Sequence, residues 1–295
     1  MQPAIEVLTE PDVAFAMTLP IDLSRLTGVP LTLLLPLYYR AVDARQRVPL
    51  LGDPAAGLIL KRLQYDPALL TGASHDRVMV MMRAREFDRR TRAFLAMHPN
   101  ATIIELGCGL DTRCYRVDDG CAWWYEVDLP EVIDLRREVL SEFSRCRFIA
   151  SSVLDFSWMD LIPEPVASAV LVLAEGLLMH FEDDQVRSLV RALGARFPGS
   201  HLICDVFSRF FVRLSPWLHP VLRRVHAMPR WGIERSTDPE SWGGQIRLIE
   251  EWTCFDRPES RLGLMQLLRF VPPIANGARV LHLQLGPAPT SRSDP

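Results

Sequence analysis

The chain has 295 residues, of which 48% are hydrophobic, and its formal net charge is −3. This length and composition predict one large domain, or one domain with an added cap, built around a sizeable core. The nearly balanced charge argues against a nucleic-acid partner, which would require a basic face. The apolar stretch from Leu31 to Tyr39 is broken by Pro36 and is too short for a membrane span, which needs roughly 20 residues.

The chain start and the cysteines favour a cytoplasmic protein. The opening MQPAIEVLTEPDVAF carries acids and prolines and lacks the charged-then-apolar pattern of a signal peptide. The cysteines form no CxxC pair and the histidines form no HExxH pattern, so we expect no metal site. Most cysteines fall in or beside expected strands, where a reduced thiol acts as a small core side chain.

Residues 1–75 are expected to form a mainly helical cap, and Val78 to Met97 one long amphipathic helix. From residue 101 onward, short β-rich runs alternate with helical segments. The expected strands are ATIIEL, AWWYEV, RFIAS, SAVLVLA, HLICDVF, IRLIEEWTCF and ARVLHLQL. Continuous apolar runs indicate strands that are buried on both faces, as in a parallel sheet covered by helices. Residues 76–287 therefore predict an α/β domain with a seven-stranded, doubly wound sheet whose last strand runs antiparallel.

Helices are expected at 131–143, 182–197 and 262–268, the second opening with acids that favour a helix N-terminus. Residues 208–245 interrupt the alternation and predict a helical lid insertion. Its aromatic side chains, including Trp217 and Trp231, either line a pocket for a flat acceptor or form the core of the lid. The tail at 288–295 is expected to be disordered.

The loop after the first strand reads ELGCGLDT, with glycines at 107 and 109. Such glycines permit a tight turn and a close approach of a ligand to the backbone. A dinucleotide fingerprint would require a third glycine where Thr112 stands, and we expect Asp111 to repel a pyrophosphate. The loop therefore favours S-adenosylmethionine, which has no phosphate and carries a sulfonium. Gly107 could approach its amino-acid end, and Glu105 could attract its ammonium.

Acidic residues follow the next strands. Asp128 ends the second strand, where a carboxylate can accept both ribose hydroxyls, and Glu126 is either its neighbour or a solvated side chain. The third strand leads into Ser152 and Asp155 near the expected adenine edge, and the alternative for Asp155 is a helix cap. Glu175 follows the fourth strand, where an unpaired carboxylate would be costly.

These motifs together resemble the leucine carboxyl methyltransferase superfamily, and within it the bacterial branch of polyketide O-methyltransferases. The matching stretches are RAREFD at 83–88, ELGCGLDTRCYRV, WYEVDLPEVI, SSVLDFSWMD, AEGLLMHF and SWGGQIRLIEEWTCFDRP. The resemblance extends from about residue 32 to 285. It implies the class I methyltransferase fold, which is Rossmann-like, with an N-terminal helical cap.

The resemblance also assigns site residues. Arg83 matches the arginine that reaches the cofactor carboxylate, and Glu175 matches a glutamate near the methionine moiety. Gly107, Gly109 and Asp128 match the cofactor loop and the ribose carboxylate. Two departures stand out: Ser152-Val153 replaces an Asp-Leu pair of many relatives at the adenine segment, and His180 replaces an aromatic residue.

We therefore expect an S-adenosylmethionine-dependent O-methyltransferase that acts on a carboxylate of a small molecule such as a polyketide-type metabolite. His180 leaves a phenolic acceptor open, because a histidine could serve as its general base. A protein C-terminal carboxylate as acceptor, an NAD-dependent oxidoreductase and a catalytically silent cofactor-binding protein are the remaining alternatives. Arg113 and Arg116, after the loop, are expected to be structural partners of Asp111 or Asp118.

Overall fold

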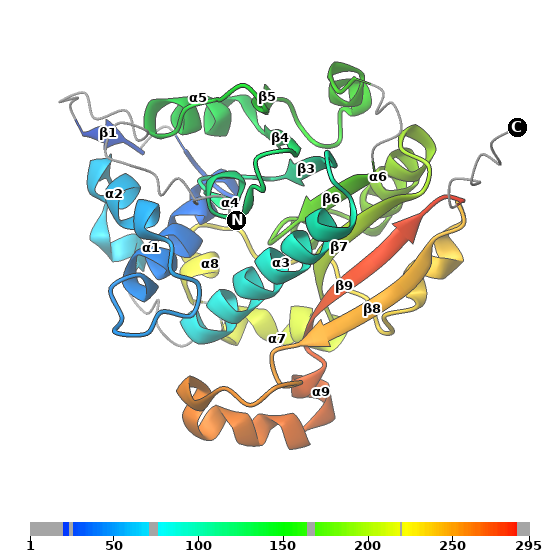
Figure 1. The fold of residues 1–295 in the computed structure, drawn as a ribbon. Coiled ribbons are helices and arrows are strands. Elements are labelled where there is room, and N and C mark those ends of the chain that lie inside the picture. Colours follow the sequence, from blue (N-terminus) through cyan, green and yellow to red (C-terminus); the bar gives the residue numbers. More distant parts are fainter. Residues whose placement is uncertain (1–19, 24–25, 71–75, 164–168, 219, 288–295) are drawn as a thin grey trace, which may run out of the picture.

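The computed structural model describes residues 20–23, 26–70, 76–163, 169–218 and 220–287. Its centre is a seven-stranded sheet in the order β5-β4-β3-β6-β7-β9-β8 (Figure 1). The strands of this sheet are β3 (Thr102–Leu106), β4 (Trp123–Asp128), β5 (Cys146–Ala150), β6 (Val170–Ala174), β7 (Ser200–Phe207), β8 (Arg247–Thr253) and β9 (Ala278–Leu285). Strands β3 to β7 run parallel to one another, and β9 pairs antiparallel with both β7 and β8. The predicted doubly wound sheet with an antiparallel last strand is confirmed.

Helices cover both faces of the sheet, and the two faces bury separate hydrophobic clusters. One cluster joins the sheet to the helices of the N-terminal half and to α5, and the other joins it to α6 and to the segment after β7. Figure 1 shows α3 running across one face. The α-helices are α1 (Leu34–Asp43), α2 (Pro54–Arg62), α3 (Arg77–Met97), α4 (Arg113–Val117), α5 (Pro130–Val139), α6 (Asp183–Arg196), α7 (Arg209–Leu218), α8 (Pro220–Arg224) and α9 (Pro272–Ala275).

Local sequence explains where α6 and α5 begin, and the extent of α3 agrees with the pattern of its sequence. Helix α3 spans nearly the segment expected for it. Helix α6 starts with a capping box, in which Glu182 and Gln185 each satisfy a backbone N–H of the first turn. The acids at its first turn also favour the helix dipole. Helix α5 begins at Pro130, whose fixed φ and missing N–H suit the first helical position.

Two details differ from the sequence-based expectation. A short parallel pair, β1 (Ile21–Asp22) with β2 (Leu63–Gln64), lies within the segment expected to be helical. The helix expected around 262–268 is a 3₁₀ segment, η6 (Ser260–Phe270), which is kinked where Gly263 adopts φ +53°. The remaining 3₁₀ segments are η1 (Pro30–Leu33), η2 (Pro67–Leu70), η3 (Phe156–Leu161), η4 (Leu178–His180) and η5 (Asp238–Trp242). The expected disorder at 288–295 lies outside the described residues.

Among its described residues, the segment after β7 is helical in α7, α8 and the short η5. Its tryptophans do not behave alike: Trp217 is 82% exposed, whereas Trp231 and Trp242 are 4% and 3% exposed. The rings of Trp231 and Trp242 meet edge to face with centroids 6.1 Å apart, and the indole N–H of Trp231 donates to Asp183 at 3.0 Å. Of the two readings left open by the sequence, Trp231 and Trp242 therefore fit the core of this segment.

The buried position of Trp231 predicts its contribution to stability. Trp231→Ala should lower the free energy of unfolding by about 3–5 kcal/mol, because truncation of a large buried ring leaves a cavity. Trp217→Ala should change it by less than about 0.5 kcal/mol, as is usual for an exposed site. Urea unfolding followed by circular dichroism measures both values. Equally small effects for the two variants would contradict the core position of Trp231.

Candidate active site

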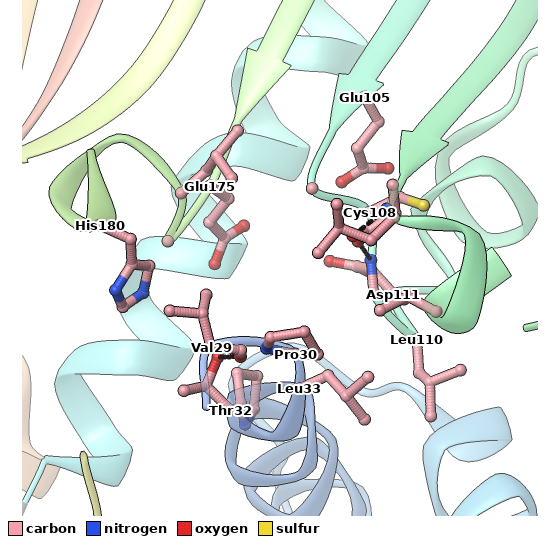
Figure 2. Close-up of a pocket in the computed structure, with 18 of the residues that line it drawn as sticks. Val29, Pro30, Thr32, Leu33, Glu105, Cys108, Leu110, Asp111, Glu175 and His180 are labelled. Carbon is pink, nitrogen blue, oxygen red and sulfur yellow. Dashed lines mark hydrogen bonds between the residues drawn. The ribbon is translucent and has the colours of Figure 1, made fainter. Parts of the chain in front are cut away.

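A cavity of about 260 Å³ opens at the carboxyl ends of β3, β4 and β6. Figure 2 shows Glu105 and Glu175 at the strand ends, facing Val29 and Leu33 of the N-terminal segment, with His180 to one side. The order of the strands reverses between β3 and β6, and open α/β sheets bind their ligands at such a switch point. The sequence-predicted site residues that line the cavity are Arg83, Glu105, Gly107, Gly109, Asp128, Ser152, Glu175 and His180.

Glycines shape the cavity where backbone and ligand must come close. Gly107 and Gly109 have φ of +66° and +49°, a region that other residues rarely adopt. A Cβ at Gly107 would lie 2.8 Å from Leu177 Cδ1. Gly176, which follows β6 with φ +68°, leaves room for Arg83, whose Nη2 would lie 3.4 Å from a Cβ there. The loop after β3 and the turn after β6 therefore depend on glycine at these positions.

The carboxylate of Asp128 is held at the mouth of the loop. Its oxygens accept hydrogen bonds from the backbone N–H groups of Gly109 at 2.7 Å and Leu129 at 2.8 Å. Burial raises its pKa to about 6 despite these two bonds. Since Asp128 also lines the cavity, the geometry fits a carboxylate that accepts hydrogen bonds from a ligand.

Glu126 is a buried neighbour of the site and is not solvated. It is fully buried and forms an ion pair with Arg136, which is buried as well. The same guanidinium donates to the carbonyls of Gly109 at 2.9 Å and Asp111 at 2.7 Å. Glu126 therefore supports the glycine loop through Arg136 and does not itself line the cavity.

The two residues expected near the adenine lie in different positions. Ser152 lines the cavity together with Val153. Asp155 does not line it and instead caps η3, where its carboxylate accepts from the backbone N–H of Ser157 at 3.2 Å. The helix-cap reading of Asp155 fits this geometry better than a contact with the adenine.

Arg83 lies between two acids at the strand ends. Its Nε donates to Glu175 at 3.0 Å and its Nη1 to Asp205 at 2.8 Å. Asp205 in turn accepts from the backbone N–H of Gly176 at 2.6 Å. Within the described chain, Nη2 of Arg83 donates no hydrogen bond, which leaves it for an anion in the cavity. Arg85, two positions further along the helix, points elsewhere, toward Glu259 at 3.7 Å, so only Arg83 of the two faces the site.

Arg113 is fully buried and binds acids from three elements. Its guanidinium pairs with Glu105 of β3, with Asp88 of α3 at 2.9 Å and with Glu175 after β6 at 2.5 Å. Burial raises the pKa of Glu105 to about 7, and its second oxygen has no hydrogen-bond partner among the described residues. The structural role expected for Arg113 is confirmed, and through it Glu105 and Glu175 hold their positions.

The expectation that Asp111 repels phosphate is wrong. Its carboxylate pairs with Arg40 at 2.7 Å, with Arg116 at 2.5 Å and with Arg113 at 3.3 Å. These cations outweigh the effect of burial and hold its pKa well below the usual range. The negative charge of Asp111 is therefore compensated by the arginines around it. What still separates the loop from a dinucleotide fingerprint is Thr112, which is buried and donates to Asp53 at 2.8 Å.

His180 offers the cavity a neutral imidazole. Burial, and secondarily Arg230, lower its pKa to about 4. Its Nδ1 is buried and has no hydrogen-bond partner in the described part of the chain. An imidazole with this pKa is uncharged near pH 7, so it can exchange a hydrogen bond with a ligand but is only a weak base.

Sequence reasoning missed Arg40 and Asp205, and it left Asp88 unassigned. Asp205 had a signal, because a lone acid inside the apolar run HLICDVF must find a partner when it is buried. Arg40 had no comparable signal: it lies in α1 and reaches the carbonyl of Leu110 at 2.7 Å only in the folded chain. The contact ties the N-terminal segment to the glycine loop.

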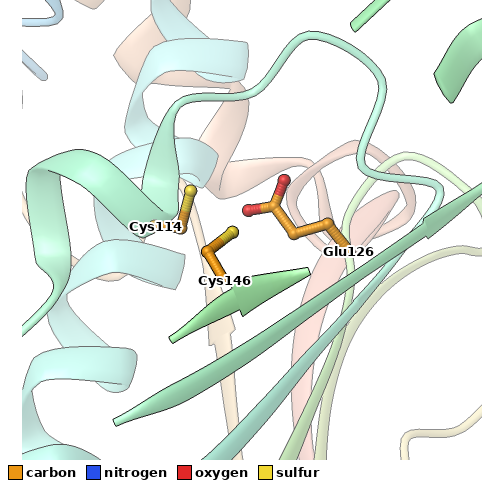
Figure 3. A group of neighbouring side chains, drawn as sticks. All are labelled: Cys114, Glu126 and Cys146. Atoms are coloured by element: carbon orange, nitrogen blue, oxygen red, sulfur yellow. The ribbon is translucent and has the colours of Figure 1, made fainter. Parts of the chain in front are cut away.

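One group of potential metal ligands occurs among the described residues, and it lies beneath the loop and outside the cavity. It comprises Cys114, Glu126 and Cys146, all buried (Figure 3). Glu126 already pairs with the Arg136 guanidinium, so a metal ion would have to displace a buried cation. Burial also raises the pKa of the Cys114 thiol well above its usual value, which disfavours the thiolate that metals bind. Across the described ranges, no helix has the length and apolar character of a membrane span.

Comparison with solved structures supports the class I methyltransferase fold. A candidate methyltransferase from Thermobifida fusca superposes with a TM-score of 0.53 at 18% identity, covering 84% of this chain and 94% of that one. A DUF574 family protein from Streptomyces avermitilis gives a TM-score of 0.57 at 13% identity, with 85% and 97% covered. At such identities the likeness concerns the fold alone, and the predicted fold class is confirmed.

Sequence comparison defines the family. The model of the leucine carboxyl methyltransferases matches residues 34–194. The tetracenomycin polyketide synthesis O-methyltransferase TcmP of Streptomyces glaucescens is 35% identical over 235 residues, which are 79% of this chain and 86% of that protein. The methyltransferase dpfgK of Gibberella zeae is 32% identical over 193 residues, 59% of this chain and 63% of that protein. The chain belongs to the leucine carboxyl methyltransferase family and is a methyltransferase, as predicted.

The position of Asp128 predicts how the cofactor binds. Asp128→Ala should weaken the binding of S-adenosylhomocysteine by about 1–3 kcal/mol, the usual cost of leaving polar partners unmet. Because its pKa is about 6, the carboxylate form should prevail above pH 7, and affinity should fall as pH drops through 6. Isothermal titration calorimetry from pH 5 to 8 measures both effects.

Asp134→Ala is the matched control, because Asp134 is a 67% exposed aspartate on the helix that follows Asp128. It should leave the affinity and its pH dependence unchanged. Glu105 titrates nearby with a pKa of about 7, so the difference between the wild-type and Asp128→Ala curves isolates Asp128. Identical curves would exclude Asp128 from the cofactor site.

Proposed function

We propose that the protein transfers the methyl group of S-adenosylmethionine to a carboxylate oxygen of a small polyketide-type acid, forming a methyl ester. S-adenosylmethionine is the methyl donor, as predicted, and relatives such as the Gibberella zeae protein carry this cofactor in their names. The name of the Streptomyces glaucescens relative supports O-methylation of a polyketide.

The residues of the cavity fit the cofactor. Nη2 of Arg83 can bind its carboxylate, and the free oxygen of Glu105 can accept from its ammonium. Gly107 leaves the backbone open to its amino-acid end, and Asp128 can accept from its ribose hydroxyls. When bound, the cofactor supplies an electrophilic methyl group on a cationic sulfur. The protein contributes position and electrostatics.

The observation that carries the choice of a carboxylate is the low basicity of His180, which lines the cavity, because the more basic carboxylates Glu105 and Asp128 are assigned to the cofactor. His180 has a pKa of about 4, whereas a phenol ionises near pH 10, so proton transfer to this histidine is uphill by about 8 kcal/mol. Asp111 and Glu175 are each held by arginine guanidinium groups. A carboxylic acid, with a pKa of about 4, is already ionised and requires no base. The neutral imidazole can then donate a hydrogen bond to it.

A phenolic acceptor remains the second candidate, because His180 lines the cavity and its buried Nδ1 has no partner in the described residues. A protein C-terminus as acceptor and a silent cofactor-binding protein are further alternatives. Retained cofactor binding without turnover on any acceptor would favour the silent protein.

The carboxylate proposal predicts the chemistry of the product. Methyl transfer from labelled S-adenosylmethionine should give a product that releases labelled methanol on mild alkaline hydrolysis, because an ester is cleaved whereas an aryl methyl ether survives. His180→Phe should retain turnover within about tenfold of the wild type, since no base is needed. If His180 is a general base, the variant should instead lose roughly 100-fold or more. A base-stable product together with an inactive variant would overturn the proposal.

The pH profile at saturating cofactor separates the same alternatives. With a carboxylate acceptor, the rate should be flat from about pH 6 to 9, because the acceptor is ionised throughout. An unassisted phenol should instead react about tenfold faster for each pH unit as its phenolate fraction grows toward a pKa of about 10. Rates measured with buffers of constant ionic strength test this, and a slope near one would contradict the carboxylate proposal.

A further inference from the structure

A second, smaller cavity of about 80 Å³ lies beside the first, between α3, α7 and the ends of β7, β8 and β9. Most of its wall is apolar and aromatic. The side chains of Met79 and Val80 come from α3, Phe207 ends β7, Phe211 lies on α7, and Trp252 lies on β8. Phe207 and Phe211 contact each other, with ring centroids 5.1 Å apart. A small apolar pocket with a few polar groups at one end is the usual form of a site for part of an organic ligand.

The two cavities share Arg83 as a common wall. Arg83 lines both, and it joins Glu175, which lines the first, to Asp205, which lines the second. A ligand held in the second cavity would therefore lie just across one guanidinium from the proposed cofactor site. This proximity points to the methyl acceptor as the occupant.

The charges at the edge of the second cavity restrict what enters it. The acids there are Asp76, which accepts from the hydroxyl of Tyr39, and Asp205. Two cations face them: Arg83, which already pairs with Asp205 at 2.8 Å and with Glu175 at 3.0 Å, and Arg279, which donates to the backbone carbonyls of Glu234 and Ile233. A second anion in this cavity would meet two carboxylates and two arginines that already hold other partners, so it would lose its hydration without a full partner.

We propose that the second cavity holds an uncharged apolar group of the methyl acceptor, while the acceptor's carboxylate stays in the first cavity. This inference rests on the proposed function and specifies its substrate class: an amphipathic acid whose apolar part is inserted between α3 and α7. Phe211 and Val80 then determine acceptor specificity without touching the cofactor.

The test uses 4-methylphenol as a neutral, single-ring probe, titrated into the complex with S-adenosylhomocysteine and followed by saturation-transfer NMR. Phe211→Ala should weaken probe binding at least fivefold, because it removes one aromatic wall. Val80→Phe should weaken it at least tenfold, because the added ring fills the cavity without truncating the core. The control is Phe210→Ala, which removes the same ring from the adjacent, 47% exposed position on α7 and should leave the affinity unchanged.

A charged probe tests whether the second cavity excludes anions. 4-Methylbenzoate should bind at least tenfold more weakly than 4-methylphenol, and equal binding that Val80→Phe abolishes would overturn the exclusion of charged groups. Probe affinity that neither Phe211→Ala nor Val80→Phe changes would overturn the inference as a whole. In the methyl-transfer assay both variants should raise the KM for the acid acceptor and keep the affinity for S-adenosylhomocysteine. Failure of the wild-type protein to bind S-adenosylhomocysteine would instead overturn the proposed function.

Discussion

The cavity depends on one fully buried cation, the guanidinium of Arg113. A buried charge is tolerated only when it is paired and hydrogen-bonded, and removal of one partner of such a pair commonly costs about 3–5 kcal/mol. Arg113 meets this requirement with Asp88 from α3, Glu105 from β3 and Glu175 from the end of β6. These acids come from separate elements, so the need to neutralise one guanidinium fixes the long helix, the central strand and the strand beside it in a single geometry.

The same network determines the electrostatic character of the site. The negative charges of Asp111 and Glu175 are compensated by arginines. The positive charge of Arg83 is compensated by Glu175 and Asp205. The cavity therefore shows a ligand a few directed donors and acceptors, such as Nη2 of Arg83 and the carboxylate of Asp128, and little net field. Such preorganised groups suit methyl transfer, in which the cofactor carries the reactivity and the protein fixes the approach.

Much of the fold and of the site could be predicted because the signals are local. Apolar runs such as SAVLVLA mark strands buried on both faces, and acids or glycines directly after such runs fall at the ligand-binding edge of a parallel sheet. Asp128, Glu175 and the glycine loop follow from that rule. The rule does not predict which group each of these side chains binds. Asp155 follows a strand as well, yet its carboxylate caps η3.

The sequence by itself determined the strand segments, the glycine turn and the family, because periodicity, residue conformation and motif spacing are properties of neighbouring residues. Only the tertiary structure decided which charged side chains are paired and which can bind a ligand. Arg113 pairs with Asp88, which is 25 positions away along the chain, and with Glu175, which is 62 positions away. Arg40 donates to the carbonyl of Leu110, which is 70 positions away. Tertiary packing likewise buried Trp231 and exposed Trp217, two residues of identical chemistry. Distance in space sets Coulomb energy and burial, and sequence separation does not encode that distance.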